Sequence, residues 1–151
     1  MELIIIRGRQ NDGKTTTATM LHNELVARSD AVRLLKTNGY CLPVGNNVCD
    51  FSSVIDIEEK RVAIISEGDE ADVLNKKMEE LIYVFRPDVM VVCARAYNRE
   101  GSSYRMLEEN YGEHIKNENV FWTEKTEDFT DALNAKRSVV NKIVKQINRA
   151  K

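Results

Sequence analysis

The sequence predicts an α/β fold of three layers, in which a mostly parallel sheet lies between two layers of helices. Short apolar runs rich in β-branched residues recur along the chain, as in parallel strands that are buried on both faces. Segments with apolar residues at helical spacing alternate with these runs. One polar turn at residues 58–60 joins two runs directly, which predicts a hairpin that adds a single antiparallel strand.

The first third of the chain is predicted to form a strand, a helix and a second strand. Residues 2–7 contain the apolar run Leu-Ile-Ile-Ile, residues 14–28 carry apolar side chains at helical spacing, and residues 31–35 form the next strand. Residues 36–50 contain glycine, proline and several asparagines, which predicts a long loop. Long ordered loops are often functional, so this loop is of interest for binding.

The middle of the chain is predicted to form the hairpin, a helix and a further strand. Residues 52–57 and 61–66 are the two hairpin strands. Residues 70–85 carry one apolar stripe and acidic residues in the first turn, which favours a helix, and Pro87 ends it. Residues 89–94 are continuously apolar and predict another buried strand.

The last third begins with a polar loop at residues 96–102, followed by a short helix at 103–111. Residues 120–122 predict a last short strand, and Thr126 is expected to cap a final amphipathic helix. The sequence contains no internal repeat, low-complexity segment or linker, so residues 1–151 are predicted to form a single domain.

The composition is that of an ordinary globular protein, with 42% hydrophobic and 30% charged residues in a chain of 151. The 22 basic and 24 acidic residues give a net charge of −2, which argues against a dedicated nucleic-acid surface. Basic residues gather only near the end of the chain, where a solvated helix face is the favoured interpretation. These residues are Lys136, Arg137, Lys142, Lys145, Arg149 and Lys151.

The expected location is the cytoplasm. No apolar run has the length of a membrane span, and the first residues lack the basic region of a signal peptide. The three cysteines are odd in number and have no spacing typical of a zinc site, so reduced thiols are expected. A membrane partner is therefore not predicted.

A glycine-rich segment follows the first predicted strand. Residues 8–15, Gly-Arg-Gln-Asn-Asp-Gly-Lys-Thr, fit the pattern G-x-x-x-x-G-K-[ST]. Glycines let successive backbone N–H groups point inward around an anion, and the helix that follows adds its positive end. Lys14 can reach terminal phosphates, and the Thr15 hydroxyl suits Mg²⁺, which prefers oxygen ligands. The segment therefore predicts a site for the phosphates of a nucleotide.

On this motif the chain resembles the P-loop NTPase superfamily. The match is specific over residues 3–21 and architectural beyond them. The resemblance implies a P-loop nucleotide-binding domain over residues 1–151 that uses Mg²⁺ with ATP or another NTP. It also implies that the nucleotide is held by Gly8, Arg9, Gln10, Asn11, Asp12, Gly13, Lys14, Thr15 and Thr16. The Asp12 carboxylate would repel phosphate if it pointed inward, so we expect it to face outward.

A second acidic residue at the end of another strand is needed to hold the water shell of the metal. Glu67 closely follows the apolar run at 61–66, and Asp69 comes two residues later. Either carboxylate is a candidate for the metal beside Thr15, and Glu67 is a candidate catalytic residue. Capping of the helix that begins near Glu70 is an alternative role for both, and the two roles can coexist.

Two further resemblances point to particular branches of the P-loop NTPase superfamily, but they do not assign the chain to one subfamily. A strand followed by Glu-Gly is similar to the segment after the third strand of dethiobiotin synthetase and of the molybdopterin-guanine dinucleotide biosynthesis adaptor protein. The run Gly13-Lys14-Thr15-Thr16 is also common there. The ATPases of that branch that partition and carry cargo have lysine second in the motif, whereas this chain has Arg9.

Three arginines bracket the polar segment after the strand at 89–94, namely Arg95, Arg99 and Arg105. In small P-loop kinases a mobile lid after a comparable strand brings arginines onto the transferring phosphoryl group. By that resemblance Arg99, with Arg95, is a candidate catalytic residue that would stabilise the transition state. A solvated surface loop with ordinary arginines is the alternative interpretation.

A small GTPase would have the same order of strand, loop, helix, irregular segment and hairpin, with Thr37 as its switch threonine. The Asp-x-x-Gly motif of that family is absent after the hairpin, where Ser-Glu-Gly-Asp stands at 66–69. The guanine-reading Asn-Lys-x-Asp is also absent. Adenine is therefore the default base.

The sequence leaves three functions open. The first is a small Mg²⁺-dependent phosphotransferase of the kinase type, or an ATPase, that acts on a small-molecule acceptor entering past residues 36–50. The second is a nucleotide-dependent switch or binding module for a protein partner, with weak hydrolysis. In the third, the anion site is retained without catalysis.

Overall fold

The computed structural model describes residues 1–9, 13–37, 50–123 and 129–150. That part of the chain forms six strands and four α-helices, in an order that alternates between the two types. The strands are β1 (Glu2–Gly8), β2 (Ala31–Thr37), β3 (Phe51–Ile57), β4 (Lys60–Ile65), β5 (Val89–Arg95) and β6 (Ile115–Trp122). The helices are α1 (Lys14–Val26), α2 (Ala71–Phe85), α3 (Ser103–Tyr111) and α4 (Phe129–Arg149), with a short 3-10 turn at Gly112–His114.

All six strands join one sheet in the order β2-β3-β4-β5-β1-β6. Strand β3 runs antiparallel to both of its neighbours, whereas β4, β5, β1 and β6 are parallel. The predicted α/β class, with a mostly parallel sheet and one antiparallel hairpin strand, is confirmed. Strand β5 lies between β4 and β1, so the strand before Glu67 is not a direct neighbour of the strand before the glycine-rich turn.

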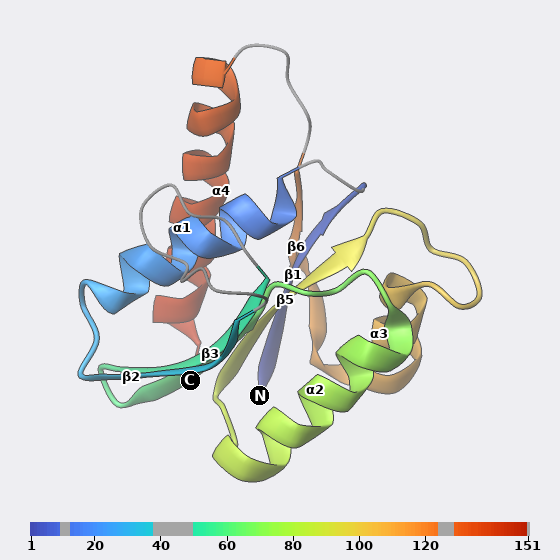
Figure 1. The fold of residues 1–151 in the computed structure, drawn as a ribbon, viewed down its shortest axis with the longest axis horizontal. Helices are drawn as coiled ribbons and strands as arrows, with labels where there is room; N and C mark the ends of the chain where they lie inside the picture. Colours follow the sequence, from blue (N-terminus) through green and yellow to red (C-terminus); the bar gives the residue numbers. More distant parts are fainter. Residues whose placement is uncertain (10–12, 38–49, 124–128, 151) are drawn as a thin grey trace.

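Helices cover both faces of the sheet, as the sequence predicts (Figure 1). Helices α1 and α4 lie on one face, and α2 and α3 lie on the other (Figure 1). Alternate residues of β1 supply the two cores: Ile4 and Ile6 pack with Leu21 of α1, and Leu3 and Ile5 pack with Leu74 of α2. Full burial stabilises the fold by about 1.5–3 kcal/mol for each such side chain, which explains why the strand is apolar on both faces.

Strand β6 is longer than the sequence indicates, because it begins at Ile115 rather than at residue 120. Its first half contains the exposed residues Lys116, Asn117 and Glu118, and it carries an irregularity in its pairing with β1. An edge strand has only one neighbour and can present polar side chains to solvent, so it lacks the apolar pattern that reveals a central strand. The proposed cap Thr126 lies outside the described residues.

The direction of the strands decides where the predicted site residues meet. The carboxyl ends of parallel strands share one edge of the sheet, which is where open α/β sheets bind ligands. The turn after β1, the segment after β4 and the segment after β5 therefore all lie at this edge.

Among the described residues, no helix is long and apolar enough to cross a membrane.

Candidate functional site

The turn between β1 and α1 depends on two glycines. A Cβ at Gly8 would lie 2.3 Å from Thr123 Oγ1 and 3.4 Å from the Thr123 carbonyl oxygen, so a side chain there would displace at least the Thr123 hydroxyl. Gly13 has a φ of +90°, a conformation that costs other residues about 1–2 kcal/mol. The Gly13 carbonyl accepts a hydrogen bond from Thr17 N, which forms the first turn of α1. Three predicted phosphate-binding residues, Gln10, Asn11 and Asp12, lie outside the described residues.

Lys14 is the most deeply buried cation of the site, with 7% of its side chain exposed. Its ammonium group bends back across the turn and donates to the carbonyl oxygens of Gly8, at 2.8 Å, and Arg9, at 3.2 Å. The ammonium also lies 3.4 Å from the half-exposed Asp69 carboxylate. The burial of Lys14 is thus balanced by two neutral acceptors and one carboxylate. An anion at the turn would offer the ammonium a stronger, charge-assisted partner.

Thr15, a predicted metal ligand, donates a hydrogen bond from Oγ1 to Asp50 Oδ1 at 3.2 Å. Burial raises the pKa of Asp50, and the charges of Glu67 and Asp69 raise it further, whereas the Thr15 hydrogen bond lowers it. The charges of Glu67 and Asp69 therefore act on Asp50, whose hydrogen bond links it to Thr15. Thr16, the last residue of the predicted nucleotide-binding set, is half-buried in the first turn of α1.

Asp50 is the functional candidate that the sequence interpretation did not single out, because it stands at the end of the predicted loop. Strand β3 is antiparallel to its neighbours, so its amino end lies at the same edge of the sheet as the carboxyl ends of β1, β4 and β5. Its position in the sequence corresponds to that of Glu67. Asp50 stands directly before the antiparallel hairpin strand, and Glu67 closely follows the parallel hairpin strand. Only the pairing of the hairpin with the parallel strands reveals what that position means.

Glu67 and Asp69, the other predicted acids, face cations rather than backbone N–H groups. Glu67 forms an ion pair with Lys77 of α2, and Asp69 Oδ1 lies 3.4 Å from Lys14 Nζ and 3.3 Å from Arg95 Nε. Helix α2 begins after Glu70, whose side chain makes no capping hydrogen bond. The metal-binding and capping roles of Glu67 and Asp69 therefore stay predictions.

Gly68 holds the segment with these two acids against the sheet. A Cβ at Gly68 would lie 1.5 Å from the carbonyl oxygen of Cys93, so the backbone of the segment touches β5 directly. The Cys93 thiol is fully buried, which raises its pKa to about 12, and it donates weakly to the carbonyl oxygen of Lys14 at 3.7 Å. Cys93 is therefore an unreactive core residue that packs beneath the site.

The three candidate arginines occupy different positions. Arg95 contacts Asp69 and so lies next to Lys14. The Arg99 guanidinium stacks on the exposed Tyr97 ring, 4.6 Å from its centroid, and Arg105 donates to Asn98. The described contacts thus bring Arg95 to the acids of the site, while the catalytic role of Arg99 stays a prediction.

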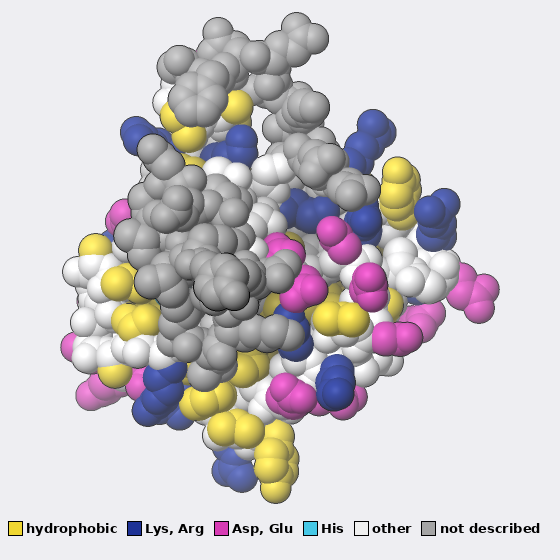
Figure 2. All heavy atoms as spheres, in the orientation of Figure 1, with side chains coloured by type: hydrophobic (Ala, Val, Ile, Leu, Met, Phe, Trp, Pro, Cys, Tyr) yellow, Lys and Arg dark blue, Asp and Glu magenta, His cyan; other side chains and the backbone are white. Residues whose placement is uncertain are grey.

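On the face drawn in Figure 2, basic and acidic side chains lie interspersed. Within the described ranges, no group of three or more His, Cys, Asp or Glu residues is arranged to hold a metal ion. Thr15 supplies a hydroxyl and its hydrogen-bond partner Asp50 a carboxylate, and both are oxygen donors of the kind that Mg²⁺ prefers.

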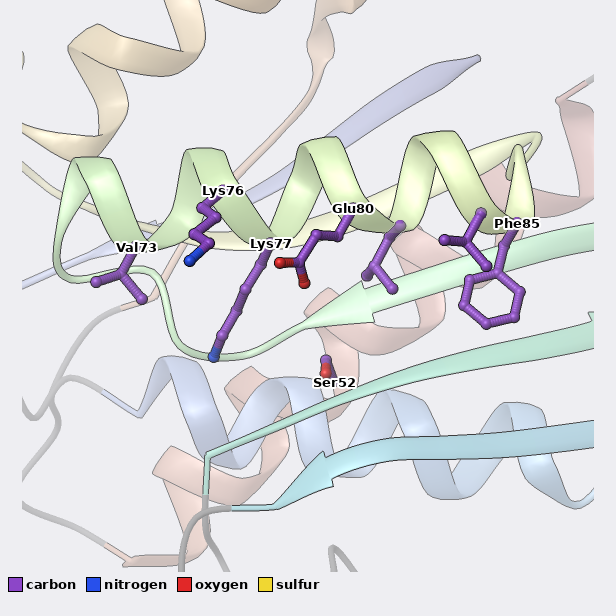
Figure 3. A pocket seen from close by; sticks show the side chains of 8 residues that line it. Ser52, Val73, Lys76, Lys77, Glu80 and Phe85 are labelled. Atoms are coloured by element: carbon purple, nitrogen blue, oxygen red, sulfur yellow. The ribbon is translucent and has the colours of Figure 1, made fainter.

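A groove of about 560 Å³ adjoins the site along one side of α2. Figure 3 shows Lys77 reaching down from α2 beside Ser52 of β3, with Val73, Lys76 and Glu80 along the same helix. Because Lys77 also forms the ion pair with Glu67, this residue connects the groove to the acids of the site. The lining combines apolar side chains with two ammonium groups and the Glu80 carboxylate, and its volume lies in the range of small-molecule sites.

Comparisons with known proteins add no assignment: no family model, no curated protein and no solved structure matches this chain.

Proposed function

We propose that this chain is an ATP-binding P-loop protein, a small Mg²⁺-dependent phosphotransferase of the kinase type or an ATPase. The observation that carries the proposal is the position of Lys14. Its ammonium group is buried at a turn that requires two glycines, at the start of α1. Asp69 lies 3.4 Å from this ammonium, and the next residue, Thr15, is hydrogen-bonded to Asp50. A cation, a helix N-terminus and hard oxygen donors together suit a magnesium-bound polyphosphate.

In this proposal the chain's own residues position the phosphates. Lys14 leaves the carbonyl oxygens of Gly8 and Arg9 and binds the terminal phosphoryl groups, where its charge offsets the negative charge of the transition state. Thr15 and Asp50 hold the metal, which would neutralise phosphate charge. Arg95 leaves Asp69 and binds the transferring group, and Arg99 remains a candidate for the same task.

An acceptor has a place beside these residues. The groove along α2 meets the acids at the pair formed by Lys77 and Glu67, so an acceptor there would approach Glu67. A Glu67 carboxylate freed from Lys77 can accept the proton of an acceptor hydroxyl. The apolar part of the lining suits an acceptor with an apolar body, and the charged side chains beside it suit polar groups on that acceptor.

The first experiment is a thermal-shift screen of ATP, GTP and other nucleotides with Mg²⁺, on the wild type and on Lys14→Ala. A ligand at about one hundred times its dissociation constant stabilises the native state by roughly 2.7 kcal/mol. We expect that shift for the wild type and for the exposed control Lys142→Ala, and its loss for Lys14→Ala. An equal shift in all three proteins would contradict the phosphate site.

The second experiment separates the phosphotransferase from the ATPase. Magnesium-dependent ADP formation is measured alone and with a panel of nucleoside, nucleotide and aryl-acid acceptors. A phosphotransferase forms ADP faster when its acceptor is present, and the phosphorylated acceptor appears in equal amount. A rate that no acceptor changes favours the ATPase.

A nucleotide-dependent switch is the second candidate, and the contact between Thr15 and Asp50 favours it. A nucleotide that recruits Thr15 to its metal would break this hydrogen bond at the start of β3. Amide hydrogen exchange of Phe51–Ile57, with and without a non-hydrolysable ATP analogue, tests the idea. A switch changes protection there beyond the few amides that touch the ligand, whereas identical exchange in β3 excludes it.

A further inference from the structure

Helix α4 brings a second lysine to the glycine-rich turn. The side chain of Lys136 lies over Gly13: its Cε is 2.4 Å, and its Nζ 3.1 Å, from the position that a Gly13 Cβ would take. Lys136 is half-buried, whereas Arg137 and Lys142 on the same helix are exposed. The interpretation of the basic tail as a solvated helix face therefore does not hold for Lys136.

This position is unfavourable for a cation in the absence of an anion. Gly13 immediately precedes α1, so Lys136 lies beside the positive end of that helix dipole. Lys14, the first residue of α1, adds another ammonium group to the same turn. Within the described part of the chain, no ion pair or hydrogen bond is made by the Lys136 ammonium. Among the described residues, Asp69 is paired with Lys14, and no carboxylate is paired with Lys136.

The two lysines reach the turn from different elements. Lys14 extends from α1 toward Gly8, and its ammonium lies on the side of Asp69, which follows β4. Lys136 comes from α4, which packs with α1 on the opposite face of the sheet from α2 (Figure 1). An anion between the two ammonium groups would therefore be contacted from both directions.

From this geometry we propose that Lys136 is a second phosphate-binding cation, and that Lys14 and Lys136 together select a ligand with a chain of at least two phosphates. The inference rests on the proposed function, because it concerns the same anion site. A chain of phosphates offers each ammonium group a phosphoryl group of its own, whereas a single phosphate would have to be shared by both. This arrangement gives a second reason for glycine at position 13, besides its positive φ: a side chain there would occupy the space of Lys136.

A purely structural role is the competing explanation, in which the aliphatic part of Lys136 covers Gly13 and its charge is incidental. Lys136→Met keeps an unbranched apolar side chain and removes the charge, so it separates the two explanations. Lys136→Arg keeps the charge and serves as the rescue variant. Lys142→Met is the matched control, because Lys142 is an exposed lysine of the same helix.

The affinities of the purified full chain for ATP, ADP and AMP are measured with Mg²⁺ by calorimetry at two salt concentrations. We expect Lys136→Met to weaken ATP and ADP binding about 10- to 100-fold, AMP binding less than about threefold, and to reduce the salt dependence of ATP binding. Lys136→Arg should recover most of the affinity, and Lys142→Met should match the wild type. Thermal unfolding without ligand checks that each variant is folded.

Three results would overturn the inference. ATP affinity of Lys136→Met equal to that of the wild type excludes a phosphate contact, and it leaves the proposed function intact if Lys14→Ala still abolishes binding. An equal loss for ATP, ADP and AMP indicates a structural role at the turn. Absence of nucleotide binding by the wild type would instead overturn the proposed function, and this inference with it.

Discussion

The Thr15 hydroxyl donates a hydrogen bond to the Asp50 carboxylate at 3.2 Å, across 35 positions of sequence. This contact joins the start of the first helix to the start of the antiparallel strand. It places an acid beside the residue that the sequence assigns to magnesium. We therefore expect Asp50 to matter more for function than for stability.

Asp50→Asn should stabilise the protein in the absence of nucleotide and weaken nucleotide binding with Mg²⁺ about tenfold. Burial raises the pKa of Asp50, so the folded state holds the proton more tightly than the unfolded state. The stability that this provides is present at low pH and is lost as pH rises from about 3.8 through the raised pKa. At neutral pH the burial of the ionised Asp50 carboxylate lowers the free energy of unfolding. The neutral amide of asparagine removes this penalty.

Urea unfolding of Asp50→Asn and the wild type between pH 3 and 7 measures this effect. The free energy of unfolding of Asp50→Asn should exceed that of the wild type by an amount that grows with pH. The exposed control Glu109→Gln should show no such trend. A variant that is less stable than the wild type at pH 7 would contradict the burial argument.

Gly68→Ala should destabilise the fold by at least about 3 kcal/mol, because its Cβ would meet the Cys93 carbonyl oxygen at 1.5 Å and the backbone of β5 cannot move aside easily. Gly112→Ala is the matched control, since nothing lies within 4 Å of its Cβ position. Chemical denaturation measures both. A Gly68→Ala protein as stable as Gly112→Ala would mean that the segment between β4 and α2 does not touch β5.

His22 should make the protein less stable in mild acid. It is buried, it lies 3.0 Å from Ser53 Oγ through Nδ1, and its ring packs edge-on against Phe51. Burial lowers its pKa below the ordinary value of 6.5, so the folded state keeps the neutral ring. The stability that this provides is complete above 6.5 and is lost as pH falls through the lowered pKa.

Unfolding of the wild type and His22→Gln between pH 5 and 8 tests this expectation. The variant should lose less stability than the wild type as pH falls, because glutamine does not titrate. Parallel curves for the two proteins would show that His22 does not cause the acid sensitivity.

Arg95→Gln should slow ADP formation about 10²- to 10³-fold with a small change in ATP affinity, because a donor aimed at developing charge acts mainly in the transition state. Arg99→Gln tests the other candidate from the sequence. Arg95 contacts Asp69, whereas Arg99 stacks on Tyr97, so we expect the larger loss for Arg95. A larger loss for Arg99→Gln would show that the segment after β5 rearranges when nucleotide binds.

Local patterns were sufficient to predict most of the fold. Continuous apolar runs identify the central strands, and helical spacing identifies the helices, because burial on one or two faces leaves a direct record in the order of residues. The same reasoning places Lys14 and Thr15 at the start of the helix after the first strand, and Glu67 and Asp69 in the segment after β4. It was insufficient for the first half of β6, where an exposed edge strand carries polar side chains.

The sequence by itself determined the fold class, the glycine-rich turn and the identity of its lysine and threonine, because each of these follows from residues adjacent in the chain. Only the tertiary structure decided that Asp50 faces Thr15, that Arg95 rather than Arg99 reaches Asp69, and that Lys136 lies over Gly13. These relationships depend on the order and direction of strands and on the packing of α4 beside α1. Contacts between residues so far apart in the chain leave no periodic signal in a single sequence.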